Sequence, residues 1–135
     1  METITLNHDL KVFYTTAASF PDGIMDAYNK LHTLIPPSSG RIYYGLSRPE
    51  NGIIVYKAAV EESYPGEAEK FNLDTMVIKK GNYISITLND WVKDTTEIGR
   101  IFTTLLHHPG IDPEGYCVEW YFNEKDVKCM VRLND

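Results

Sequence analysis

The sequence has little cysteine and no long apolar segment. Cys117 and Cys129 are its 2 cysteines, and they do not form a C-x-x-C pair. Buried thiols in a reducing compartment are therefore expected, rather than a disulfide or a zinc site. No apolar run approaches the roughly 20 residues that cross a bilayer, and residues 1–10 lack the apolar core of a signal peptide. The sequence predicts a cytoplasmic protein that does not bind membranes.

Positive charge and catalytic motifs are also scarce. The 13 Lys and Arg residues are outnumbered by 19 Asp and Glu residues, for a net charge of −6, and no segment concentrates the basic ones. Direct binding of nucleic acid is not expected, because its affinity depends on clustered basic contacts. The sequence has no G-x-S-x-G elbow and no G-x-x-x-x-G-K phosphate loop, and its 4 histidines are scattered. No cofactor and no metal are expected.

What the sequence does contain is the pattern of one α+β domain. A chain of 135 residues usually folds around a single core. Apolar residues recur at helical spacing over residues 24–35 and again over residues 98–105. Residues 19–22 and 94–97, just before these segments, have the pattern of a capping box. Two amphipathic helices are therefore predicted.

Strands are predicted where β-branched and aromatic residues lie between turn signals. These segments are residues 11–17, 42–46, 53–60, 71–78, 83–88, 116–122 and 127–133, with turns at 36–40, 48–52, 80–82 and 123–126. The order strand–helix–strand–strand occurs twice, in about residues 1–63 and 71–135. Adding 74 to Ile24 and Leu31 gives Ile98 and Leu105, which suggests a duplication. The expected fold is an antiparallel sheet with two helices on one face and a ligand cleft on the other.

Glu119 is the residue that this pattern leaves unexplained. Alternation along residues 116–122 separates two sets of side chains. The set predicted to face a helix is Val118, Trp120 and Phe122, and the set predicted to face the cleft is Cys117, Glu119 and Tyr121. A carboxylate rarely occupies a central strand without a partner. Glu119 is therefore a candidate either for an ion pair or for a ligand contact.

The two explanations for Glu119 remain open on spacing alone. In the first, the hairpin sets Glu119 opposite Met130, so that Arg132 and Lys128 are its diagonal neighbours and neutralise it. In the second, Glu119 is a recognition carboxylate at the floor of the cleft and binds the cation of a ligand. The first predicts a structural ion pair and the second predicts a binding site.

Aromatic residues favour the second explanation. Tyr121 shares the predicted face of Glu119, and alternation and the repeat place Tyr83 and Tyr44 on that face as well. Trp91 precedes the second helix, where it either covers the cleft mouth or packs against the helix start. Aromatic rings beside a carboxylate suit organic cations, through quadrupole attraction and apolar burial. Each ring taken singly is more simply explained by core packing.

These features resemble the GyrI-like small-molecule-binding domains, also called the effector-binding domains of bacterial transcription activators. The matching pieces are the strand KGNYISI at residues 80–86, the helix at 98–106 and the strand CVEWY at 117–121. The resemblance implies that Glu119 lies in an aromatic pocket, with Tyr121 and Tyr83 beside it, and meets lipophilic cations. Residues 18–20 and 89–91 depart from the glycine and aromatic pair that the family often carries there, so a different cleft mouth is expected.

The leading hypothesis is a stand-alone, non-enzymatic domain that binds a hydrophobic, cationic small molecule. Its predicted ligand-binding residues are Glu119, Tyr121, Tyr83, Tyr44 and Trp91. No room is expected for a DNA-binding module ahead of the first predicted strand. Two alternatives stay open. In one, Glu119 and Tyr121 act as base and acid in the hydrolysis of reactive electrophiles. In the other, which the resemblance implies, the domain binds a protein partner such as gyrase, or a second copy of the chain.

Overall fold

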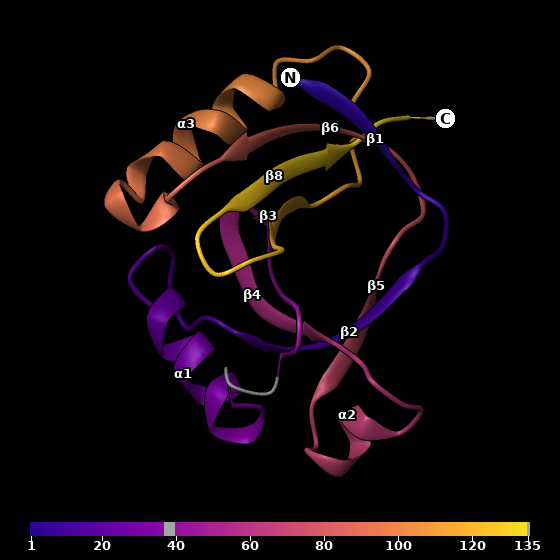
Figure 1. Ribbon diagram of the computed structural model, residues 1–135, viewed down its shortest axis with the longest axis vertical. Helices are drawn as coiled ribbons and strands as arrows, with labels where there is room; N and C mark the ends of the chain where they lie inside the picture. The colour runs from indigo at the N-terminus through magenta and orange to yellow at the C-terminus, as the bar shows by residue number, and fades with distance from the viewer. Residues whose placement is uncertain (37–39, 135) are drawn as a thin grey trace.

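The eight strands form one curled antiparallel sheet. In the computed structural model, which describes residues 1–36 and 40–134, the strand order is β1-β6-β8-β7-β3-β4-β2-β5. The sheet curls into a half-barrel, and helices α1 and α3 lie on its outer face (Figure 1). The predicted α+β architecture is confirmed. Within the described ranges, no helix combines the length and the apolar character that a membrane span needs.

The elements follow the predicted order, with one strand and one α-helix that were not predicted and a 3-10 turn before the last helix. The strands are β1 (Glu2–Leu6), β2 (Leu10–Thr16), β3 (Tyr43–Glu50), β4 (Ile53–Glu61), β5 (Asp74–Ile78), β6 (Gly81–Leu88), β7 (Cys117–Tyr121) and β8 (Val127–Arg132). The helices are α1 (Ile24–Leu34), α2 (Glu67–Lys70), the 3-10 turn η2 (Trp91–Lys93) and α3 (Thr96–Leu105). The sequence did not predict β1 or α2. The predicted turn at 36–40 includes residues 37–39, which lie outside the described residues.

Two local predictions need correction. Neither predicted capping box forms as expected: Gly23 is the N-cap of α1 and Thr95 that of α3, neither with a side-chain capping bond, although Asp94 Oδ1 accepts a hydrogen bond from the backbone amide of Thr96 at 3.1 Å. The β3–β4 turn is also shorter than predicted. It consists of Asn51 and Gly52, with φ of 54° and 79°, and such a two-residue turn with positive φ suits the twist of a hairpin. The paired strands therefore extend further than the residues 42–46 and 53–60 that were predicted.

Each face of the sheet carries its own apolar core. On the outer face, α1 packs on β2 and β4, and α3 packs on β6 and β8. On the inner face, the curl brings the strands around a core without helix residues, formed by Val12, Tyr44, Leu46, Ala59, Ile78, Tyr83, Val118 and Met130. The face opposite the helices was predicted to hold the cleft around Glu119. It forms this second core with a cavity beside it, and Glu119 lies on the other face of the sheet.

The middle of the sheet lies between the two helices. Strands β3 and β7 pair with each other at the centre of the strand order, with the α1-covered strands on one side and the α3-covered strands on the other. The residues of these two strands on the outer face are Tyr43, Gly45, Ser47, Cys117, Glu119 and Tyr121. The units β2-α1-β3-β4 and β6-α3-β7-β8 follow the same order along the chain. The duplication of the chain itself remains a prediction.

The β7–β8 hairpin has a register one residue away from the predicted one. Glu119 lies opposite Cys129, not Met130. The connecting loop spans residues 122–126, and the side-chain oxygen of Asn123 accepts hydrogen bonds from the backbone amides of Lys125 and Asp126. This compact loop has an odd number of residues, and a shift of one residue exchanges the two faces of a strand relative to its neighbour.

The predicted faces of β7 are consequently wrong. Cys117 and Tyr121 pack with α3 in the outer core, whereas Val118 and Trp120 belong to the inner core. Phe122 lies beyond the strand and is 37% exposed. Both faces of this central strand are buried. The more apolar set of side chains, which was predicted to face a helix, therefore did not show which face the helices cover.

Candidate functional site

Glu119 is a buried carboxylate held by two tyrosine hydroxyls. Its exposed fraction is 7%. Its Oε1 accepts a hydrogen bond from the Tyr121 hydroxyl at 2.5 Å and another from the Tyr56 hydroxyl at 3.0 Å. Its Oε2 has no hydrogen-bond partner among the residues that the structure describes. Burial raises the pKa of the Glu119 carboxyl, and the two hydroxyls partly offset this rise.

The ion-pair explanation for Glu119 is wrong. Within the described part of the chain, no basic side chain forms a salt bridge with it. Arg132 instead pairs with Asp112 at 3.2 Å, and Lys128 pairs with Glu2 at 3.2 Å. The shifted hairpin register explains this outcome, because it places residues 128 and 132 on the opposite face of β8 from Cys129. Glu119 is therefore a buried acid that has no cationic partner.

Gly45 provides the space in which Tyr56 reaches Glu119. Gly45 is opposite Glu119 in the β3–β7 pair. A Cβ atom at Gly45 would lie 2.1 Å from the Tyr56 hydroxyl oxygen and 2.8 Å from Glu119 Oε1. The Tyr56 side chain therefore crosses over a position that carries no side chain. Tyr56 itself is 1% exposed, so its hydroxyl has exchanged water for this buried contact.

Rings from both helical segments surround the carboxylate. The Tyr28 hydroxyl of α1 lies 3.0 Å from the Tyr56 hydroxyl, and the Tyr28 ring meets the Tyr121 ring edge-on at 6.3 Å between centroids. Phe20, in the segment before α1, stacks on Tyr56 at 6.1 Å. Trp91, in the turn before α3, packs against Tyr121 with 5.2 Å between the ring centroids. Each of the two tyrosines that bind Glu119 is thus covered by a second aromatic ring.

The ionisable groups of this cluster leave Glu119 as its source of negative charge. Burial, followed by the nearby Glu119 carboxylate, raises the pKa of the hydroxyls of Tyr28 and Tyr121, and burial is also the main cause of the raised pKa of Tyr56. Burial likewise raises the pKa of the Cys117 thiol to about 11 and that of the Cys129 thiol to about 12. The hydroxyls and thiols therefore stay protonated at neutral pH. Both cysteines are free.

The structure brings together three of the five predicted ligand-binding residues. Glu119, Tyr121 and Trp91 lie together on the outer face. Tyr83 and Tyr44 lie in the inner core instead, on the other side of the sheet. Tyr83 donates a hydrogen bond to the carbonyl of Lys79 at 2.6 Å, and burial raises its pKa to about 12. Tyr44 pairs with Trp120 across the β3–β7 ladder, so its side chain does not share the face of Glu119.

Sequence reasoning missed Tyr56, Tyr28, Phe20 and Gly45 as members of the site. Tyr56 alternates with Ala58 and Val60 along β4, and the latter two pack against α1. This alternation was a signal that could have placed Tyr56 on the helix side. Tyr28 was assigned to the apolar face of the first helix, which is the correct face, but its hydroxyl partner could not be read from helical spacing.

Comparisons with solved structures identify the fold. An integron cassette protein from the mobile metagenome of Vibrio cholerae superposes with a TM-score of 0.72 at 11% identity, covering 98% of this chain and 95% of that chain. The structure of SAV2435 bound to tetraphenylphosphonium has a TM-score of 0.65 at 13% identity, covering 97% and 93%. A protein assigned to bacterial transcription regulation from Staphylococcus aureus MU50 has a TM-score of 0.58 at 11% identity, covering 97% of both chains. No family model and no curated protein matches the sequence.

Glu119→Gln tests the protonation of the buried acid. The unfolded carboxyl titrates near its ordinary pKa of 4.5, whereas the folded pKa is raised. Stability from Glu119 is therefore complete below that ordinary value and is lost as pH rises through the folded pKa. Glutamine does not ionise, so thermal unfolding should show the wild type losing stability relative to the variant between about pH 4 and neutrality. A constant difference at all pH values would show that the pKa of Glu119 is not raised.

Proposed function

We propose that the protein is a GyrI-like small-molecule-binding domain that binds a lipophilic cation at Glu119. The observation that carries this proposal is the carboxylate itself, which is 7% exposed and, among the described residues, is hydrogen-bonded only to tyrosines. An acid without a cationic partner destabilises a fold when it ionises. Such a group is retained at a cost in stability, and ligand binding is a function that accounts for the cost.

The electrostatics of the site favour a cation over a neutral ligand. A cation near Glu119 regains the charge interaction that burial removed, and the low polarity of the surroundings strengthens that interaction. Strong hydration disfavours a small ion such as ammonium in this environment. A bulky organic cation sheds its water more easily and presents apolar surface to the rings. Glu119 would supply the charge. Its Oε2 would face the ligand, because this oxygen accepts no hydrogen bond from the described residues.

Aromatic rings would supply the walls of the site. Phe20 is 46% exposed and stacks on the deeply buried Tyr56, while Trp91 is half-buried and contacts Tyr121. Apolar ring surface therefore leads from solvent toward Glu119 along both covering residues. Because Glu119 is nearly inaccessible, entry of a ligand requires these covering rings to move aside. Binding would expose the carboxylate and bury the ligand in one step.

The shared fold supports the class of ligand. The structure of SAV2435, which has this fold, is bound to tetraphenylphosphonium, a lipophilic cation. A protein assigned to bacterial transcription regulation also has this fold. We propose that this chain acts as the ligand-sensing unit of a transcriptional response. Hydrolysis by Glu119 and Tyr121 and binding of gyrase remain predictions of the sequence, and no contact within the described chain favours either over ligand binding.

Tetraphenylphosphonium binding by the wild type and by Glu119→Gln tests the proposal. Titration calorimetry at pH 7.5 should show saturable binding by the wild type below about 1 mM. The variant should bind at least about tenfold more weakly, because it loses a charge interaction worth about 1.4 kcal/mol or more. Glutamine keeps the size of the side chain and removes the acid, so lost packing is not expected to change the affinity.

Two controls separate the local charge from the net charge. Glu124→Gln removes the same charge from an exposed loop residue and should leave the affinity unchanged. Triphenylphosphine oxide, a neutral ligand of similar shape, should bind both proteins equally. Equal affinity of the wild type and Glu119→Gln for tetraphenylphosphonium would refute the role of Glu119, and absence of binding by the wild type would refute the ligand class.

A further inference from the structure

The inner face of the sheet contains a cavity that is separate from the Glu119 site. It has a volume of about 310 Å³, at the lower end of the range for small-ligand sites. Its apolar lining comes from four strands and the segment before β7, through Leu46, Met76, Ile78, Tyr83, Tyr116 and Val118. Several of these side chains belong to the inner core, so the cavity is continuous with that core. Glu119 and its tyrosines lie on the outer face.

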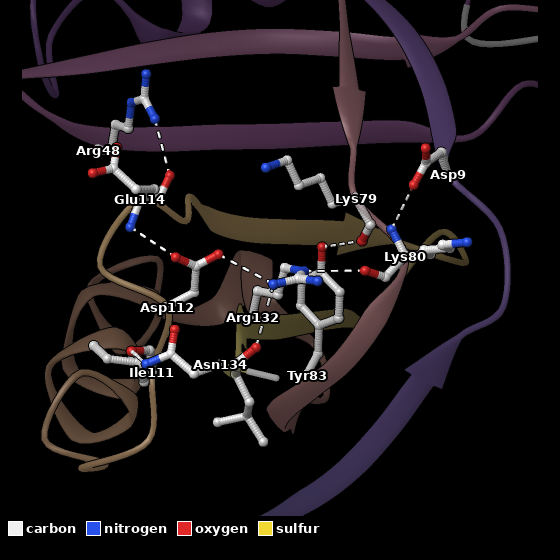
Figure 2. A network of polar contacts seen from close by, with 11 residues as sticks. Asp9, Arg48, Lys79, Lys80, Tyr83, Ile111, Asp112, Glu114, Arg132 and Asn134 are labelled. Carbon is white, nitrogen blue, oxygen red and sulfur yellow. Dashed lines mark hydrogen bonds and ion pairs between the residues drawn. The ribbon is translucent and has the colours of Figure 1, made fainter.

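Two basic side chains that line this cavity keep free donors. The amine of Lys79 has no hydrogen-bond or ion-pair partner among the described residues, and Figure 2 shows the side chain extending from the β5–β6 connection toward Arg48 and Glu114. Arg48 uses Nε toward Glu50 at 3.5 Å and Nη1 toward the carbonyl of Glu114 at 3.0 Å. Its Nη2 has no hydrogen-bond or ion-pair partner within the described ranges, and the guanidinium lies over the ring of Tyr116, with Cζ 4.3 Å from the centroid. Both groups are charged donors beside apolar surface.

The backbone that carries Lys79 is held firmly. The carbonyl of Lys79 accepts the hydroxyl of Tyr83 at 2.6 Å, and the carbonyl of Lys80 accepts Arg132 Nε at 3.0 Å. The amide of Lys80 donates to Asp9 at 2.9 Å. These contacts form the network in Figure 2. The backbone of the connection is thereby fixed from three sides, while the exposed side chain of Lys79 keeps an amine without a partner among the described residues.

The charge balance around the cavity is positive. Arg48, Lys79 and Arg132 line it together with two acids, Asp112 and Glu114. Asp112 is already neutralised, because it forms a salt bridge with Arg132 at 3.2 Å and both side chains are 15% exposed. Glu114 and Lys79 are both exposed to solvent, which screens the charge of each. In a chain with a net charge of −6, a lining with three basic side chains and two acids is a local exception that favours anions.

We propose that this inner-face cavity binds a small amphipathic anion, a carboxylate with an apolar or aromatic body. The carboxylate accepts hydrogen bonds from Lys79 and Arg48, and the apolar body lies against the side chains of the inner core. A charged donor pair next to apolar walls selects such a molecule over both a free inorganic anion and a neutral hydrocarbon. The cavity and the Glu119 site lie on different faces of the sheet, so this inference does not depend on the proposed function.

3-Phenylpropionate is a suitable probe, with amide resonances of the ¹⁵N-labelled full chain as the readout. Saturable shifts are expected at Met76, Lys79 and Tyr83, which line the cavity, while the amides of Phe20 and Tyr28, on the outer face, stay in place. Lys79→Gln should weaken the binding about tenfold, because it removes a charged hydrogen bond. 3-Phenylpropionamide, which has the same shape without the charge, should bind the wild type at least as weakly as the anion binds this variant.

Lys80→Gln is the matched control for net charge. It removes the same charge from the next residue, whose side chain does not line the cavity, and should leave the affinity for 3-phenylpropionate unchanged. If both lysine variants bind 3-phenylpropionate equally weakly, the loss of affinity comes from long-range attraction alone, and the proposal is overturned. Shifts confined to the outer face, or no saturable shift in the wild type, would also overturn it. Loss of tetraphenylphosphonium binding would not, because that result concerns Glu119.

Discussion

Gly45→Ala is expected to destabilise the fold by about 2 to 3 kcal/mol, as overpacking of a buried position does. The added Cβ would lie 2.1 Å from the Tyr56 hydroxyl oxygen and 2.9 Å from its ring carbon Cζ. Relief requires Tyr56 to leave its place, which breaks its hydrogen bond to Glu119. The carboxylate would then lose one of its two donors while still buried. Urea denaturation followed by circular dichroism measures the loss.

Gly99→Ala is the control for the effect of adding a methyl group. Gly99 lies inside α3, and a Cβ there meets no atom within 4 Å. Replacement of a helical glycine by alanine usually stabilises a helix by roughly 0.5 to 1 kcal/mol. The two substitutions should therefore change stability in opposite directions. A Gly45→Ala protein as stable as the wild type would mean that Tyr56 does not cross over Gly45, and the description of the site would be wrong.

Glu67→Gln should lower the free energy of unfolding at neutral pH by about 3 kcal/mol, as loss of one partner of a buried ion pair does. Glu67 is 4% exposed and binds Arg41 through both oxygens, at 2.7 and 2.9 Å. It also accepts the backbone amide of Ser63 at 2.8 Å. The substitution leaves the Arg41 guanidinium facing a neutral amide. Thermal and urea denaturation at pH 7 measure the loss.

The acid dependence of this loss has a defined sign. The hydrogen bond with Arg41 holds the pKa of Glu67 below its ordinary value of 4.5, although burial opposes the shift. The pair therefore contributes stability above that ordinary value and loses it as pH falls through the lowered folded pKa. The gap between the wild type and Glu67→Gln should close in strong acid, opposite to the trend for Glu119. Glu69→Gln, an exposed neighbour on α2, should show neither the loss nor the pH dependence.

Much of the fold was predictable because its signals are local. Helical spacing identified α1 and α3, and strand composition together with turn residues identified most of the sheet. The segment around Glu67 shows where local signals failed. No helix or strand was predicted there, but its glutamate is buried against Arg41, which lies 26 residues earlier. Exposure of a charged residue follows from distant contacts, and the composition of a short segment does not contain them.

The sequence by itself singled out Glu119, because an acid within an aromatic and apolar strand is unusual wherever that strand lies. It also determined Tyr121 as the companion of Glu119, since residues two apart share a strand face in any register. Only the tertiary structure decided which face that was. The loop at residues 122–126 shifted the hairpin by one residue, and this shift separated Glu119 from Arg132.

The tertiary structure also decided which tyrosines join the acid. Tyr56 reaches Glu119 from β4, more than sixty residues away in sequence, and Tyr28 of α1 joins it through the Tyr56 hydroxyl. The predicted Tyr83 and Tyr44 lie on the inner face instead. Alternation assigns side chains to two faces but does not say which face is which when both are buried. That choice depends on strand register and on the curl of the sheet, which are properties of the whole chain.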